Sequence, residues 1–242
     1  MFHRLGPAKP LGAIRVRYRC LIGINLMLGL FTSASSADPS VRRTGAPWPD
    51  TLTARVEALA LIETLNASVL AAHTATSVLD KWCADHKMAS DPAVRARIVT
   101  GIEKPISAEQ RQRLQIDATE KVAYRRVELT CGGHVLVEAD NWYVPSRLSA
   151  EINHILATTD TPFGRAVQEM KPVRQNFAVE ILWKPLPDGW EMGPTAANRP
   201  EEALSIPWQL FQHRALVYNG AHQPFSEVNE IYTREILAFG PP

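Results

Sequence analysis

The residues whose types and spacing could support chemistry lie in two segments that are predicted to be strands. The first, residues 125–131, has the sequence RRVELTC and places Arg126 within an apolar strand pattern. The second, residues 224–232, carries Glu230 between apolar residues. A charged arginine on a core strand needs a partner, because burial of an unpaired guanidinium is costly. A bound carboxylate is one candidate for that partner.

The alternation of side chains along the first strand separates a polar set from an apolar set. The polar set is Arg126, Glu128 and Thr130, and the apolar set is Val127, Leu129 and Cys131. The apolar set must face the core. From the residues alone, the Arg126 face is therefore either a solvated surface of salt bridges or the wall of a polar cavity.

Glu230 shares one face of the last predicted strand with Val228 and Tyr232. A carboxylate in apolar surroundings is poised for proton exchange, which is typical of functional sites. The alternative is an ion pair of Glu230 with Arg214 or Arg234 on an exposed face.

The first 37 residues are predicted to be a signal peptide. Basic residues precede an apolar run at residues 20–31, and small residues at Ser35 and Ala37 fit a cleavage site. An uncleaved membrane anchor is the alternative, although the run is short for a span. We expect a periplasmic or secreted protein, with a linker at 38–49 and one domain at 50–242.

Charge and motifs exclude several classes of function. Cleavage would leave 21 basic and 25 acidic residues, a formal net charge of −4, which argues against a nucleic-acid surface. The seven histidines show no metal-ligand spacing, and neither a phosphate-binding glycine loop nor a Gly-x-Ser-x-Gly motif occurs. We therefore expect no metal site and no nucleic-acid partner. We also expect a monomer without membrane contact after cleavage.

Cys83 and Cys131 would remain after cleavage of the signal peptide. In an oxidising compartment they could form a disulfide. The interpretation slightly preferred from sequence is two separate buried thiols, because Cys131 is in phase with Val127 and Leu129 and would behave as a small hydrophobic residue.

The order of predicted elements indicates an α+β fold with an antiparallel sheet, because helices come first and strands follow. Helices are expected at residues 52–73, 76–87, 148–156 and 164–170, with Thr76 or Ser77 capping the second. Strands are expected at residues 94–102, 122–130, 134–144, 177–183, 209–218 and 225–239. Residues 107–114 are predicted to be a loop or short helix, and the proline-rich residues 185–207 a surface excursion.

Three motifs in this order resemble the chorismate lyase family, whose members remove pyruvate from chorismate to leave 4-hydroxybenzoate. They are an arginine strand running through Cys131 and the Gly132-Gly133 turn to Pro145, the segment TPFGR at 161–165, and the last strand with Glu230. The resemblance covers roughly residues 65–240. It implies a single antiparallel sheet with helices packed on one side and flap segments that enclose an internal cavity.

The resemblance also implies roles for individual residues. Arg126 would hold the ring carboxylate with its two-pronged guanidinium, and Glu230 would contact the 4-hydroxyl group; Glu227 stays open as the alternative to Glu230. Further ligand contacts are expected from Thr76, Glu128, Phe163, Gly164 and His213, although a lone strand histidine is more often structural.

Two departures from the family pattern leave two functions open. Asn141, preceded by Asp140, stands where the family commonly has a second basic residue, and Glu128 replaces an aliphatic residue. Both changes reduce the positive charge available for a dianion such as chorismate. The first hypothesis is a chorismate lyase-like enzyme without a cofactor. The second is an exported, non-catalytic binding protein for a small aromatic carboxylate. The same fold also serves as a sensing domain in some bacterial regulators.

Overall fold

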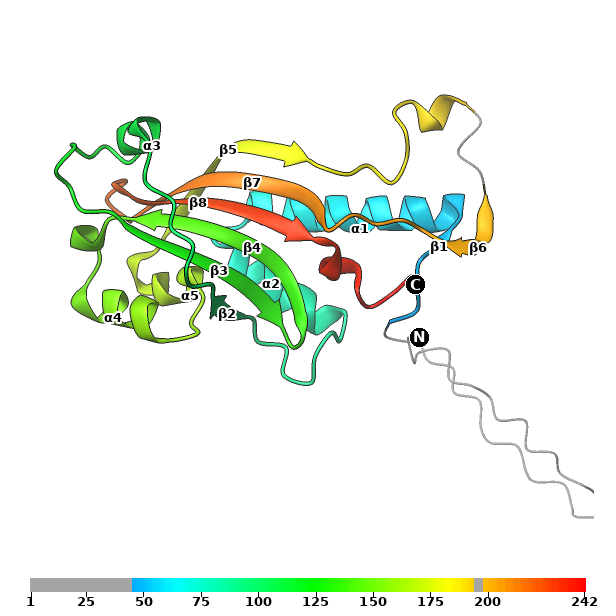
Figure 1. Cartoon of the computed structure of the whole chain (residues 1–242), viewed down its shortest axis with the longest axis horizontal. Coiled ribbons are helices and arrows are strands. Elements are labelled where there is room, and N and C mark those ends of the chain that lie inside the picture. The colour runs from blue at the N-terminus through cyan, green and yellow to red at the C-terminus, as the bar shows by residue number, and fades with distance from the viewer. Residues whose placement is uncertain (1–44, 194–197) are drawn as a thin grey trace, which may run out of the picture. The chain divides into compact units, whose positions relative to one another are not determined.

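The main sheet contains six strands, each antiparallel to its neighbours (Figure 1). In spatial order they are β2 (Arg95–Ile98), β3 (Ala123–Cys131), β4 (His134–Tyr143), β8 (Pro224–Thr233), β7 (Gln209–Tyr218) and β5 (Val173–Ile181). The structure is a computed structural model that describes residues 45–193 and 198–242. The α+β prediction with antiparallel pairing is confirmed. The predicted signal peptide lies outside the described residues.

A second sheet of two strands, β1 (Pro49–Asp50) and β6 (Arg199–Ala203), makes the expectation of a single sheet wrong. The proline-rich excursion returns to the segment just before the first helix. There the amide of Leu204 donates to the carbonyl of Trp48 at 2.7 Å. The strands are short because proline lacks the N–H that a longer ladder needs.

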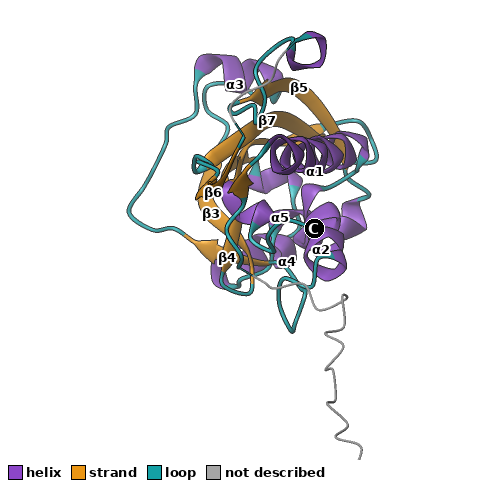
Figure 2. Ribbon diagram, turned by 90° about the vertical axis from the view of Figure 1, so that its right-hand side faces the viewer, coloured by secondary structure: helices purple, strands orange, loops and turns teal. Residues whose placement is uncertain are grey.

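Helices α1 (Leu52–Ala71), α2 (Ala75–Asp85), α4 (Ala150–Thr158) and α5 (Phe163–Ala166) pack on one face of the main sheet, here called the inner face (Figure 2). Hydroxyl caps at Thr51, Thr74 and Ser149 begin the first three of these helices. Thr74 therefore caps α2, where the sequence predicted Thr76 or Ser77. Short 3₁₀ turns lie at η1 (Pro145–Arg147), η2 (Gln168–Met170), η3 (Trp190–Met192) and η4 (Arg234–Leu237).

Helix α3 (Ala108–Arg113) packs on the opposite, outer face, so the expectation that all helices lie on one side is also wrong. Its Arg113 side chain forms an ion pair at 2.8 Å with Glu227 of β8. A capping box between Ser107 and Gln110 fixes the helix start. This segment covers part of the outer face, which the sheet would otherwise expose to solvent.

The main core lies between the inner face and helices α1 and α2. Its largest fully buried side chains include Tyr232, Phe211, Ile62, Leu65 and Leu79. Phe211 and Tyr232 stack with ring centroids 4.2 Å apart. Within the described part of the chain, no helix combines the length and the apolar composition needed to cross a bilayer.

Cys83 of α2 and Cys131 at the end of β3 form a disulfide, with Cα atoms 6.2 Å apart. The preference for two separate thiols was therefore wrong. The phase argument was sound, since Cys131 does face the core with Val127 and Leu129. It did not reveal that α2 lies directly against this end of the strand. The bridge fixes α2 on the inner face.

Candidate functional site

A small cavity of about 50 Å³ lies between the inner face of the sheet and helices α2 and α5. Its walls combine apolar side chains with a few charged and polar groups. The apolar walls are Val127, Leu129, Ala139, Phe163, Val167, Val217 and Val228. The polar lining comes from His73, Thr74, Thr76, Arg125, Asn141, Arg174 and Glu230. A few polar groups in an apolar cavity are typical of a small-molecule site.

Arg125 is the cation at one side of this cavity and is only 6% exposed. Its terminal nitrogens donate to the backbone oxygens of Thr159 and Thr161 at 3.3 Å, and its Nε has no acceptor. Among the described residues, no carboxylate forms an ion pair with Arg125. Burial lowers the pKa of Arg125 from its usual value. A buried guanidinium without a carboxylate is costly, so this position favours an anionic ligand.

Two further groups beside Arg125 can donate hydrogen bonds to an anion. Asn141 pairs with Arg125 across β3 and β4, and its Oδ1 accepts from Ser226 at 2.5 Å. Its buried Nδ2 has no acceptor in the described structure. The first turn of α2 also lines the cavity through Ala75 and Thr76. Backbone amides in a first helical turn lack intrahelical acceptors and attract negative charge.

Glu230 and Arg174 also line the cavity and form a buried ion pair, with 2.6 Å between the carboxylate and guanidinium. Burial alone would lower the pKa of Arg174, but the nearby charge of Glu230 raises it overall. Tyr232 lies at the same pair, 3.4 Å from Glu230, and burial raises the pKa of its hydroxyl well above normal. Glu230 is therefore an oriented hydrogen-bond acceptor with its charge already compensated.

His213 is fully buried behind Glu230 but does not line the cavity. Its Nε2 lies 2.7 Å from Oδ1 of Asn66, whose amide nitrogen donates to Glu63. Nε2 therefore carries the proton, and the buried Nδ1 has no donor in the described structure. Burial lowers the pKa of His213 to about 4. His213 was expected to contact the ligand, but its ring packs between β7 and α1 and does not line the cavity.

Arg126 and Glu128 do not reach the cavity, because they alternate onto the outer face. Arg126 binds Asp140 at 3.0 Å and lies 3.6 Å from Glu138, while Glu128 pairs with Arg97. Arg126 and Glu128 were expected to contact the ligand, but both side chains lie on the face of the sheet away from the cavity. The outer face here is a surface of salt bridges, which was the first alternative that the residues alone suggested.

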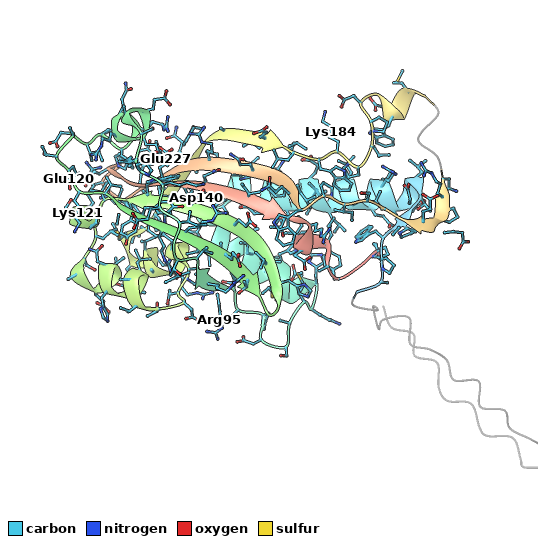
Figure 3. All side chains as sticks on the ribbon, viewed as in Figure 1. Arg95, Glu120, Lys121, Asp140, Lys184 and Glu227 are labelled. Atoms are coloured by element: carbon cyan, nitrogen blue, oxygen red, sulfur yellow. A yellow bond between two sulfur atoms is a disulfide. The ribbon has the colours of Figure 1, made fainter. Side chains whose placement is uncertain are left out.

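Buried carboxylates at Asp140 and Glu227 organise the outer face, and both are labelled in Figure 3. Asp140 accepts from Lys104 at 2.6 Å and from Tyr124 at 2.5 Å. Arg113 holds Glu227 with two contacts of 2.8 Å. We call this set, with Arg126 and Glu138, the outer network. Glu227, the alternative to Glu230, thus has a structural partner on α3 and lies away from the cavity.

Four of the expected site residues do line the cavity: Thr76, Phe163, Gly164 and Glu230. Sequence reasoning missed Arg125, Asn141 and Arg174 as a set. The signal for Arg125 was present, since it alternates in phase with Val127 and Leu129 on the core face. Arg174 gave no such signal, because the strand was expected to begin only at Phe177. The described residues contain no cluster of three or more metal-ligating side chains.

A larger cleft of about 610 Å³ lies next to the cavity and shares four lining residues with it. The shared residues are His73, Thr74, Thr76 and Gly164. The cleft, here called the lateral cleft, is otherwise lined by Ser77, Asp80, Arg165, Gln168, Lys171, Pro172 and Val173. The two spaces therefore meet at the contact between α2 and α5.

The sheet, its helices and the enclosed cavity define an α+β protein with an internal site. No known family model matches the chain. The chain is 43% identical over 196 residues to the uncharacterized protein y4mC of Sinorhizobium fredii, covering 81% of this chain and 83% of y4mC. The chain therefore belongs to the same protein family as y4mC.

Solved structures give weaker likenesses. YydK of Bacillus subtilis matches with a TM-score of 0.36 and 16% identity over 59% of each chain. The effector domain of PhnF from Mycobacterium smegmatis matches with a TM-score of 0.38 and 12% identity, over 58% of this chain and 81% of that domain. A GntR-family regulator from Enterococcus faecalis gives 0.36 and 11%, over 57% and 91%. These scores are too low to inform the chemistry of the cavity.

Proposed function

We propose that this protein binds a small organic acid in the inner cavity, with the ligand carboxylate on Arg125. The observation that carries the proposal is the burial of Arg125 without a carboxylate partner among the described residues. A ligand carboxylate would supply the missing charge and accept from Nε. Hydrogen bonds between charged groups of this kind are short and strong.

The surroundings of Arg125 support an acid with an apolar body. Asn141 Nδ2 and the first turn of α2 add donors at the charged end. Valine, leucine and phenylalanine side chains line the middle, and Glu230 offers an acceptor held by Arg174. An aromatic acid with a distal hydroxyl, such as 4-hydroxybenzoate, matches this order of groups.

Binding of 4-hydroxybenzoate to the full chain by isothermal titration calorimetry tests the proposal. Arg125→Met should weaken binding by about 2–5 kcal/mol, because it removes one partner of a buried charged pair. Arg126→Met is the matched control, since the neighbouring arginine lies on the outer face. It should change binding by less than about twofold. Equal losses in the two variants, or no binding to the wild-type chain, would refute the proposal.

A second candidate function is elimination of pyruvate from chorismate, with 4-hydroxybenzoate as product. The position of Glu230 favours it, because an oriented carboxylate and a cation line one cavity. Such a site can orient a substrate and stabilise developing charge. Pyruvate release from chorismate, followed with a coupled lactate dehydrogenase assay, separates the candidates. Release that Arg125→Met and Glu230→Gln both abolish would indicate an enzyme, whereas ligand binding without release would indicate a binding protein.

We also propose that the protein is exported to an oxidising compartment. The disulfide between Cys83 and Cys131 supports this location, because structural disulfides persist mainly outside the cytoplasm. Periplasmic and cytoplasmic fractions of an expressing bacterium would be denatured and treated with a thiol-reactive mass tag. Protein in the periplasmic fraction with neither of these cysteines labelled is the expected result. Recovery of the protein in the cytoplasmic fraction would contradict it.

A further inference from the structure

The lateral cleft has the position and polarity of a second half of the ligand site. The cavity of about 50 Å³ holds far less than the roughly 150 Å³ of an apolar cavity that admits benzene. An aromatic acid such as 4-hydroxybenzoate therefore needs more room than this cavity gives without movement of its walls. The rest of any larger ligand must extend outward, and the lateral cleft of about 610 Å³ is the adjoining space.

The two spaces meet at the contact between α2 and α5, where Thr74, Thr76 and Gly164 line both of them. A Cβ atom built on Gly164 would lie 2.8 Å from Oγ1 of Thr76 and 3.0 Å from Cβ of Thr74. Real Cβ atoms essentially never lie within 3.0 Å of another heavy atom, so a larger residue here would force a displacement. Glycine at this position therefore lets α5 pack closely against α2, and a ligand that reaches from one space into the other must separate these two segments.

The far part of the lateral cleft is polar. Arg165 donates hydrogen bonds to both carboxylate oxygens of Asp80, at 3.0 and 2.8 Å. Gln168 and Lys171 also line the cleft, and neither makes a side-chain hydrogen bond or ion pair within the described structure. These two side chains are free to donate to a ligand. The opposite side offers the hydroxyl groups of Thr74 and Ser77.

We propose that the ligand is an extended acid whose carboxylate binds Arg125 and whose polar tail occupies the lateral cleft. This inference rests on the proposed function, because it needs the acid group inside the cavity. It narrows the ligand class to acids with a hydrogen-bonding substituent opposite the carboxylate. A bare aromatic acid would then occupy only the inner part of the site.

Three probes with the same carboxylate end test the inference on the full chain by calorimetry: benzoate, 4-acetamidobenzoate and 4-propylbenzoate. The acetamido compound should bind about tenfold tighter than benzoate, the gain expected from one or two hydrogen bonds. The propyl compound has a similar length without the polar atoms. It should gain less than about threefold, because it cannot form the hydrogen bonds that Gln168 and Lys171 offer.

Substitutions in the lateral cleft test which residues cause the tighter binding of 4-acetamidobenzoate. Gln168→Leu should reduce the advantage of 4-acetamidobenzoate to about twofold and leave benzoate affinity unchanged. Gln175→Leu, on the exposed side of β5, is the matched control and should change neither ligand. Gly164→Ala should weaken the extended acid by about tenfold or more through the close contact with Thr76. The added Thr76→Ala substitution removes that contact and should restore part of the affinity.

The outcomes separate the two proposals. Equal affinity for benzoate and 4-acetamidobenzoate, with both losing affinity in Arg125→Met, would overturn the extended ligand and leave acid binding intact. A gain that Gln168→Leu does not touch would also overturn it. Failure of all three acids to bind, or binding indifferent to Arg125, would overturn both proposals together.

Discussion

Arg125 and Arg126 are neighbours on one strand, but they lie on opposite faces of the sheet and have different partners there. On the outer face, Arg126 binds Asp140, which Lys104 and Tyr124 also contact. On the inner face, Arg125 meets only backbone oxygens, and its Nε has no acceptor. The charged groups of the outer network pair with one another. In the inner cavity, Arg125 has no carboxylate partner among the described residues.

This difference indicates where the chain is built for stability and where it is built for binding. A satisfied network on the outer face fixes the covering segment with α3 to the sheet. A cation left without a carboxylate destabilises the free protein, and the proposed acid ligand would offset that cost. Proteins commonly accept such a local cost at functional sites.

The largest effect should come from breaking the outer network at Asp140, which is 3% exposed. Asp140→Ala should cost about 3–5 kcal/mol of unfolding free energy, because Lys104 and Arg126 lose their shared carboxylate. Urea unfolding measures this cost. Asp160→Ala is the control, since Asp160 pairs with Arg95 on an exposed surface and should cost at most about 1 kcal/mol. Similar costs for the two variants would contradict the distinction.

The ion pair between Arg174 and Glu230 should show a cost of similar size that a second substitution removes. Arg174→Met alone leaves a buried carboxylate and should cost about 3 kcal/mol or more. The double variant Arg174→Met with Glu230→Gln should recover most of that loss, because no buried charge remains. Urea unfolding of both single variants and the double variant completes the cycle. A double variant no more stable than Arg174→Met would argue against a buried, coupled pair.

His213 should make the inner face sensitive to acid. Burial lowers its pKa from 6.5 to about 4, so the native ring stays neutral where the unfolded chain takes up a proton. Stability should therefore fall as pH drops from about 6.5 to 4, by about 3 kcal/mol in total. His213→Gln should remove this part of the pH dependence, and His154→Gln, on the exposed side of α4, should not. Unchanged pH profiles in His213→Gln would contradict the burial argument.

The smallest expected effect on stability comes from replacing Arg125, and it compares the two arginines directly. Arg125→Met should leave the unfolding free energy of the free protein unchanged or raise it by about 1 kcal/mol, because it removes an uncompensated buried charge. Arg126→Met should lower the free energy by about 1–3 kcal/mol, since Asp140 loses a partner. Thermal and urea unfolding without ligand compare the two. A larger loss for Arg125→Met would mean that the inner arginine is structural.

The α+β class, the helix at 52–73, the hairpin at 122–144 and the long β7 could be predicted because each depends on local periodicity and turn residues. The expected strand start at Phe177 missed Arg174, because residues 174–176 are all polar and show no apolar pattern. The family resemblance implied a single sheet, and β1, a strand of two residues, leaves no periodic trace that would have indicated a second one. Arg126 was favoured over Arg125 because a family pattern outweighed the alternation of the strand itself.

The sequence by itself determined that the strand from 123 to 131 has two chemically different faces, since side chains alternate with a period of two. It also supplied two adjacent arginines, one for each face. Only the tertiary structure decided which arginine received a partner. Asp140 and α3 come together on one side, while Cys83, α2 and Glu230 enclose the other. Those contacts join residues far apart in the chain, so no local pattern could reveal them.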